Sequence, residues 1–128
     1  MREFIEAVEQ HNVDALLDLM ADDVEFRSPV VFKQYTGREA VGHILRAVMQ
    51  VFEDFRYVNT LSNDRGGHAL VFEANVGDRS LEGCDFIETD ADGRISRFTV
   101  MVRPLSAAHA LAAAMSARLD ADAAPRGA

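Results

Sequence analysis

The sequence predicts an α+β fold in which helices cover one face of a mostly antiparallel sheet. An apolar stripe with helical spacing runs from Val41 to Phe52, which is typical of a long amphipathic helix. From Phe55 to Arg103 the apolar pattern changes to a period of two, in runs separated by short loops. Short loops join antiparallel neighbours, and a sheet of this size must bury one face. The long helix is its expected cover.

Length and charge exclude several classes of protein. The chain of 128 residues is long enough for one hydrophobic core and too short for a two-domain enzyme. With 13 basic and 21 acidic residues its net charge is -8, a sign that repels nucleic acid and anionic membrane surfaces. No apolar segment is long enough for a secretion signal or a membrane span. We therefore expect a cytoplasmic protein that binds neither nucleic acid nor membranes.

The N-terminal segment predicts a pair of short helices followed by a short strand. Apolar residues recur with helical spacing over 4–8 and again over 13–20, and Asn12 is a suitable N-cap for the second helix. Apolar and polar residues then alternate from Val24 to Ser28, which indicates a strand. Pro29 is expected to end this strand, because proline cannot donate a ladder hydrogen bond.

The long helix is expected to begin at a capping box, Thr36-Gly-Arg-Glu39. In this motif the Thr36 hydroxyl accepts from the Glu39 backbone N–H, and the Glu39 carboxylate reaches back. Beyond the helix, the alternating runs predict antiparallel strands over 55–61, 69–76, 80–89 and 94–103.

The C-terminal segment predicts one more helix. Pro104 is expected to end the sheet and Ser106 to cap the helix, which is rich in alanine and has only a narrow apolar stripe. We interpret it as a lid or a partner-facing element rather than a core helix. The sequence thus predicts a single domain over residues 1–119 and a disordered tail over 120–128.

Asp85 is the leading candidate for chemistry. It is in phase with the apolar residues Leu81 and Ile87, so an inward-facing Asp85 carboxyl would lie in an apolar pocket. Desolvation there would raise its pKa, and a partly protonated carboxyl can donate to a carbonyl or act as a base. The alternative is that Asp85 faces outward or pairs with an arginine across the sheet.

The candidate ligand-binding residues are hydroxyl donors, apolar side chains and one arginine. Arg103 either reaches the interior, where it can clamp a carboxylate or phenolate, or stays solvated on the outer face. Most aromatic residues are expected in the core, but their number favours a cavity for a flat, largely apolar ligand. The complete set is Ser28, Tyr35, Phe52, Tyr57, Phe72, Met101 and Arg103.

The sequence predicts no metal site and no cofactor. The four histidines lie on separate predicted elements, and paired ligand spacings such as HExxH do not occur. The lone cysteine, Cys84, has no partner for an internal disulfide and is opposite in phase to Asp85, so we interpret it as a buried or interface thiol.

Three motifs resemble the NTF2-like superfamily, in its SnoaL-like branch, over roughly residues 4–105. They are the segment Ala21-Asp-Asp-Val-Glu-Phe-Arg-Ser-Pro29, the helix start Tyr35-Thr-Gly-Arg-Glu-Ala-Val41, and the pair Asp85-Phe-Ile-Glu with Asp92-Gly-Arg-Ile95. The resemblance implies a cone, in which a strongly bent sheet wraps around the long helix beside an N-terminal helical pair. It also implies an interior pocket for a small hydrophobic ligand and a homodimer formed through the outer sheet face.

The resemblance to ketosteroid isomerases is incomplete at the catalytic positions. The tyrosine that donates to the oxyanion falls on Phe4, the general-base aspartate falls on Ser28, and only the second oxyanion aspartate is kept, as Asp85. General-base catalysis is worth about 10²–10⁴-fold, so steroid isomerisation by that mechanism is not expected.

Two functions remain open at this point. The first is a pocket protein that acts as a cofactor-independent isomerase, cyclase, dehydratase or hydrolase, with Asp85 as acid or base. The second is a non-catalytic module for ligand binding or dimeric association. Epoxide hydrolysis is disfavoured, because that site needs an arginine and two carboxylates around one water.

Overall fold

The computed structural model describes the backbone of residues 1–123 and the side chains of residues 1–120. Over these residues the elements follow the order α1 (Arg2–Glu9), α2 (Val13–Asp18), β1 (Met20–Arg27), β2 (Gln34–Thr36), α3 (Arg38–Val51), β3 (Glu53–Ser62), β4 (Gly67–Val76), β5 (Arg79–Thr89), β6 (Ile95–Arg103) and α4 (Leu105–Ala123).

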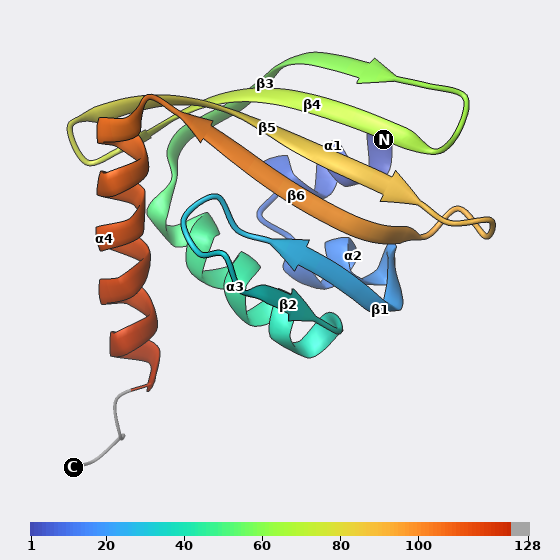
Figure 1. Ribbon diagram of the computed structural model, residues 1–128, viewed down its shortest axis with the longest axis horizontal. Coiled ribbons are helices and arrows are strands. Elements are labelled where there is room, and N and C mark those ends of the chain that lie inside the picture. The colour runs from blue at the N-terminus through green and yellow to red at the C-terminus, as the bar shows by residue number, and fades with distance from the viewer. Residues whose placement is uncertain (124–128) are drawn as a thin grey trace.

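The strands form one bent sheet in the order β2-β1-β6-β5-β4-β3. All neighbours are antiparallel except β1 and β6, which pair in parallel. Figure 1 shows the long strands β3 to β6 arching over α1, α2 and α3, with α4 standing at one end of the sheet. This arrangement confirms the predicted α+β fold.

Helix α3 buries the predicted apolar stripe under the sheet, with Val41, Ile44 and Leu45 inaccessible to solvent or nearly so. The predicted capping box at its start is wrong. Thr36 is the last residue of β2 and pairs with Glu25, while Gly37 is the N-cap, with φ 95° and no side-chain cap. The chain enters α3 directly from a strand, and that reversal needs the left-handed backbone that glycine adopts without strain.

The N-terminal helices follow the prediction, and the first strand departs from it. Asn12 Oδ1 accepts from the Ala15 backbone N–H at 3.0 Å, which confirms Asn12 as the N-cap of α2. Strand β1 begins at Met20 rather than Val24, with an irregularity in its pairing to β6 between Met20 and Glu25. Such a bulge interrupts the alternation of side chains, so sequence periodicity does not detect the start of the strand.

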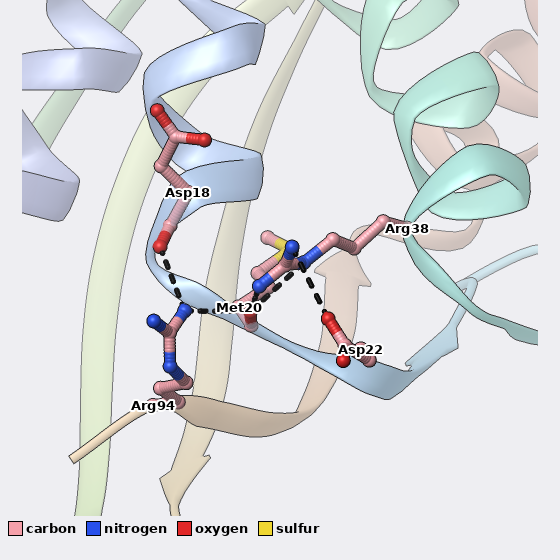
Figure 2. Close-up of polar contacts among 5 residues, drawn as sticks. All are labelled: Asp18, Met20, Asp22, Arg38 and Arg94. Carbon is pink, nitrogen blue, oxygen red and sulfur yellow. Dashed lines mark hydrogen bonds and ion pairs between the residues drawn. The ribbon is translucent and has the colours of Figure 1, made fainter. Parts of the chain in front are cut away.

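Two arginines fix the junction between α2 and β1 (Figure 2). Arg38, the first residue of α3, donates through Nε to the Met20 carbonyl at 3.0 Å and pairs through Nη1 with Asp22 Oδ1 at 3.2 Å. Arg94, from the turn before β6, donates to the carbonyls of Asp18 at 3.2 Å and Met20 at 3.5 Å. Both guanidinium groups therefore converge on one carbonyl oxygen.

Helix α4 belongs to the core, which corrects the interpretation that its apolar stripe is too narrow. Ala107, Leu111 and Met115 are buried, and the helix packs against α3 and against β4, β5 and β6. Small alanines allow this close approach. The helix continues to Ala123, past the predicted boundary at 119, and residues 124–128 of the predicted tail lie outside the described residues.

No helix in the described part of the chain is long and apolar enough to cross a membrane.

Candidate functional site

A cavity of about 170 Å³ lies between the concave face of the sheet and the helices. Its walls are aromatic and aliphatic side chains from all four helices and from β1, β3 and β6. Polar side chains are few among the residues that line it. They are Glu9, His11, Ser28, Tyr57 and Asp85. A cavity of this kind suits an apolar ligand that a small number of polar groups orient.

Asp85 lies in the wall of this cavity and is only 4% exposed. Alternation along β5 turns Asp85 to the concave face, and its cross-strand neighbours Leu70 on β4 and Val100 on β6 are also buried. Among the described residues it is the one buried charged side chain. Burial raises the pKa of the Asp85 carboxyl to about 7, because desolvation disfavours its charged form.

Tyr57 on β3 is the hydrogen-bond partner of Asp85. Its hydroxyl donates to Asp85 Oδ2 at 2.7 Å. This bond lowers the Asp85 pKa, but less than burial raises it. Burial and the charge of Asp85 raise the pKa of Tyr57 well above its usual value, so the phenol stays protonated and remains a donor. No side chain in the described part of the chain forms a hydrogen bond with Asp85 Oδ1.

The missing side chain of Gly83 makes the space through which Tyr57 reaches Asp85 across β4. Gly83 on β5 faces Phe72 on β4, and the Phe72 ring occupies the space where a Cβ at Gly83 would lie, 2.2 Å from that position. The Tyr57 ring packs edge-on against Phe72 with centroids 6.3 Å apart, and edge-on against Phe55 at 4.9 Å. Phe72 thus packs against Tyr57 and is not among the residues that line the cavity.

The polar groups nearest solvent lie at the mouth of the cavity. Glu9 and His11 are exposed residues that also line it, and Ser28 is half-buried beside them in the lining. Ser28 Oγ accepts from the Val30 backbone N–H at 3.1 Å, so the hydrogen of its hydroxyl remains available to a ligand.

The structure brings four of the predicted site residues to the cavity, namely Ser28, Phe52, Tyr57 and Asp85. Tyr35, on β2, instead packs its ring against that of Phe26 on β1, with ring centroids 6.4 Å apart. It is not part of the cavity lining.

Met101 and Arg103 are not among the residues that line the cavity. Both lie on the outer face of β6, because alternation along this strand turns Phe98 and Val100 inward. Met101 is 58% exposed, and Arg103 forms an exposed ion pair with Glu82 at 3.2 Å.

Glu9 and His11 also line the cavity and are not among the predicted site residues. A signal for His11 exists, since it stands immediately before the N-cap Asn12, where the first helix must end and where glycine is the usual residue. Nothing in the sequence shows that this turn faces the cavity, because the sheet that closes it comes much later in the chain.

Metal-binding residues do not gather at the cavity. His11 is the one histidine in its lining, and no group of three or more histidine, cysteine or acidic side chains suited to a metal occurs among the residues described. Cys84 lies on the outer face of β5, half-buried, and burial raises the pKa of its thiol.

The position of Phe4 separates this cavity from the ketosteroid isomerase pattern. Phe4 is 1% exposed and packs against Phe98 with ring centroids 5.5 Å apart, so it offers no hydroxyl. Ser28 offers no carboxylate at the other catalytic position. The polar chemistry inside the cavity therefore rests on Asp85 and Tyr57.

Comparison with known proteins places these features in a family context. The model of the SnoaL-like domain matches residues 1–98. The crystal structure of a steroid delta-isomerase from Pseudomonas aeruginosa is 41% identical, with 94% of this chain and 89% of that chain covered and a TM-score of 0.90. An uncharacterized protein with a cystatin-like fold from Silicibacter pomeroyi is 35% identical, with 95% and 86% covered and a TM-score of 0.90.

A more distant structure shares the fold alone. This SnoaL-like protein of unknown function from Burkholderia thailandensis is 22% identical, with 80% of this chain and 91% of that chain covered and a TM-score of 0.66. Among curated proteins, none matches the chain.

Proposed function

Because the chain belongs to the SnoaL-like family of NTF2-like proteins, we propose that it is a cofactor-independent isomerase of a small, largely apolar carbonyl compound. Asp85 is the proton carrier. The observation that carries this proposal is the buried Asp85–Tyr57 pair in the cavity wall. A carboxyl with a pKa of about 7 can both take and return a proton near neutral pH. The Pseudomonas aeruginosa structure named as a steroid delta-isomerase supports the same class of reaction.

The proposed reaction moves one proton and one double bond. The ionised Asp85, through Oδ1, takes a proton from the carbon between a ligand carbonyl and a carbon–carbon double bond. The electron pair of the broken C–H bond forms a dienolate, and Asp85 returns the proton to the far carbon of the double bond. The product is the conjugated ketone, with no atoms gained or lost. Tyr57 holds Oδ2 throughout, and the Ser28 hydroxyl is the available donor to the carbonyl oxygen.

The size of the cavity supports a small ligand. An apolar protein cavity of about 150 Å³ accepts benzene, and the cavity here is of about 170 Å³. A ligand with one ring in the enclosed part therefore fits, and a longer ligand would extend through the mouth. Ser28 stands at the general-base position of ketosteroid isomerases and has no carboxylate. The proposed reaction therefore uses Asp85 as the base.

The test is the isomerisation of a β,γ-unsaturated cyclohexenone, followed by the ultraviolet absorbance of the conjugated product. We expect turnover by the wild type and a loss of about 10²–10⁴-fold in kcat for Asp85→Asn. Asp78→Asn is the matched control, because Asp78 is exposed in the turn between β4 and β5. Equal turnover by wild type and Asp85→Asn would disprove the assignment of Asp85.

The pH dependence tests the same assignment through Tyr57. For an ionised base, kcat/KM rises with pH and levels off above the Asp85 pKa of about 7. Tyr57→Phe removes the hydrogen bond that lowers this pKa, so its profile should shift to higher pH.

A non-catalytic ligand-binding module is the second candidate. Phe4 and Ser28, which replace the tyrosine and aspartate of the ketosteroid isomerase pattern, favour it. A protein that binds cyclohexenone or a naphthol without turnover, and equally well after Asp85→Asn, would support this module over the isomerase.

We further propose a homodimer that forms through the outer face of the sheet. Leu61, Phe86 and Met101 are exposed there, in adjacent cross-strand rows. Ion pairs border these rows at both ends, and an apolar patch with a charged rim is typical of an interface. The pairs are Arg56–Glu73 and Glu82–Arg103 on one side, and Arg97 with Glu25 and Glu88 on the other. A cytoplasmic location stays a prediction from the sequence.

A further inference from the structure

His11 occupies a strained backbone position where helix α1 ends. The Asn12 N–H donates to the Ala7 carbonyl at 2.8 Å and the His11 N–H to the Val8 carbonyl at 3.0 Å, with φ 54° at His11. These bonds form a Schellman motif, in which the left-handed residue is usually glycine because a Cβ is unfavourable there. The fold of the α1–α2 turn thus needs the left-handed backbone and does not need a histidine.

The His11 side chain is exposed and takes no part in the polar contacts of the described residues. Its ring makes no hydrogen bond, ion pair or ring contact with any described residue. It lines the cavity while remaining exposed, which places it at the mouth, together with Glu9 and Ser28. Non-glycine residues held in the left-handed region cluster at active sites and at ligand-binding positions.

We propose that His11 binds a hydroxyl group of the ligand at the mouth of the cavity. An imidazole has one nitrogen that can donate and one that can accept, so it can pair with a hydroxyl in either direction. Glu9, which also lines the mouth, can accept from the same hydroxyl. An anionic group is disfavoured there, because the Glu9 carboxylate would repel it and the whole chain carries a net charge of -8.

The role of His11 deepens the proposed function. It rests on that function, because the proposed isomerisation places the reacting carbon of the ligand beside Asp85. The ligand class is then a flat, apolar ring compound whose reacting carbon lies beside Asp85, whose ketone oxygen accepts from Ser28, and whose hydroxyl group meets the exposed His11 at the mouth. Asp85 acts on the reacting carbon, and His11 holds the hydroxyl group and so fixes the orientation of the ring.

The experiment compares the affinities of two fluorescent probes, a naphthalene diol with one hydroxyl on each ring and the naphthol that has only one. We expect the wild type to prefer the diol by about five- to tenfold, the value of one hydrogen bond. His11→Gly should abolish this preference and His11→Asn should weaken it, because glycine has no side chain and the asparagine side chain is shorter than that of histidine; both residues accept a left-handed backbone. His43→Gln, an exposed histidine on α3 outside the lining, should keep it.

A second measurement separates a binding role from a structural one. Glycine relieves the strain at φ 54°, so His11→Gly should raise Tm by about 2–4 °C while it loses the diol preference. A diol preference that survives in His11→Gly would overturn the proposal, and so would a variant no more stable than the wild type.

The binding experiment also separates this proposal from the proposed reaction. Equilibrium binding needs no turnover, so a protein that fails to isomerise the cyclohexenone can still show the diol preference and its loss in His11→Gly. Asp85→Asn should remove turnover and leave the diol preference in place. A loss of diol preference in Asp85→Asn equal to that in His11→Gly would overturn the separate role of His11.

Discussion

A buried carboxyl such as Asp85 is unfavourable for the folded state when it is charged. Tyr57 supplies one hydrogen bond at 2.7 Å, whereas an ionised carboxylate in water is surrounded by many donors. The neighbours Leu70 and Val100 supply none. A structural position would be filled better by an apolar or amide residue, which is why a functional role accounts best for this aspartate.

The stability of the protein should therefore depend on pH through Asp85. Burial raises its pKa from 3.8 to about 7. Between these values the folded state keeps a proton that the unfolded state has released, so the free energy of unfolding falls as pH rises. A shift of about three units corresponds to about 4 kcal/mol, and the fall should end above the folded-state pKa.

Asp85→Asn tests this dependence, because asparagine has the same shape and does not titrate. At about pH 8 the variant should be more stable than the wild type by up to about 4 kcal/mol, and at about pH 4 the two should be nearly equal. Urea unfolding at both pH values measures the difference, with Asp78→Asn as a variant whose stability should match the wild type. A difference between Asp85→Asn and the wild type that does not change with pH would contradict the raised pKa.

The orientation of Asp85 could be predicted from the sequence, but its partnership with Tyr57 could not. Alternation with Leu81 and Ile87 is local information, and it gives the face of β5 correctly. Tyr57 lies on β3, which is separated from β5 by β4. It reaches Asp85 only because Gly83 leaves room for the Phe72 ring between them. Close packing of this kind depends on register across three strands, which no single run of residues encodes.

At the level of elements, residues of the family motifs form the polar contacts that join α3 and the turn before β6 to the start of β1. Arg38 and Asp22 come from two of the motifs and Arg94 from a third, and they meet around the Met20 carbonyl (Figure 2). The start of β1 is an irregular part of that strand. These motifs therefore report the architecture rather than the reaction, as expected for a fold that serves many chemistries.

Arg38→Ala tests the importance of this junction. We expect a loss of about 2–3 kcal/mol in the free energy of unfolding, because the Met20 carbonyl loses a charged donor in a half-buried position. Arg46→Ala is the matched control on the same helix. Arg46 pairs with Asp14 at 2.9 Å in solvent, and exposed pairs contribute about 0–1 kcal/mol. Denaturant unfolding measures both, and equal losses would contradict a special role for Arg38.

Tertiary context explains where the predicted elements differ from the observed ones. The Thr36-Gly-Arg-Glu39 pattern fits a capping box, but Thr36 is committed to β2 through its pairing with Glu25. The narrow stripe of α4 suffices for the core because α3 and three strands surround it. Local patterns describe what a segment can form, and long-range pairing decides which of those forms is kept.

For the whole molecule, the fold class could be predicted because its two main signals are strong and local. The stripe along α3 and the alternation in β3 to β6 each extend over many residues. The parallel pairing of β1 with β6 could not be predicted from these signals, since it joins the ends of the fold across about 70 residues of chain. The two missed polar lining residues, Glu9 and His11, come from the end of α1 and from the turn that follows it.

The exposed apolar rows on the outer face of the sheet predict how two copies of the chain would form a dimer. In a two-fold symmetric dimer formed through this face, the apolar rows with Phe86 and Met101 would meet the same rows of a second copy. Met101→Asp would place a charge in the centre of that contact and should raise the dimer dissociation constant more than about tenfold. Phe32→Asp is the control, because Phe32 is fully exposed in the loop between β1 and β2. Sedimentation over a range of concentrations measures the equilibrium; a monomeric wild type, or equal weakening by both variants, would exclude this face as the interface.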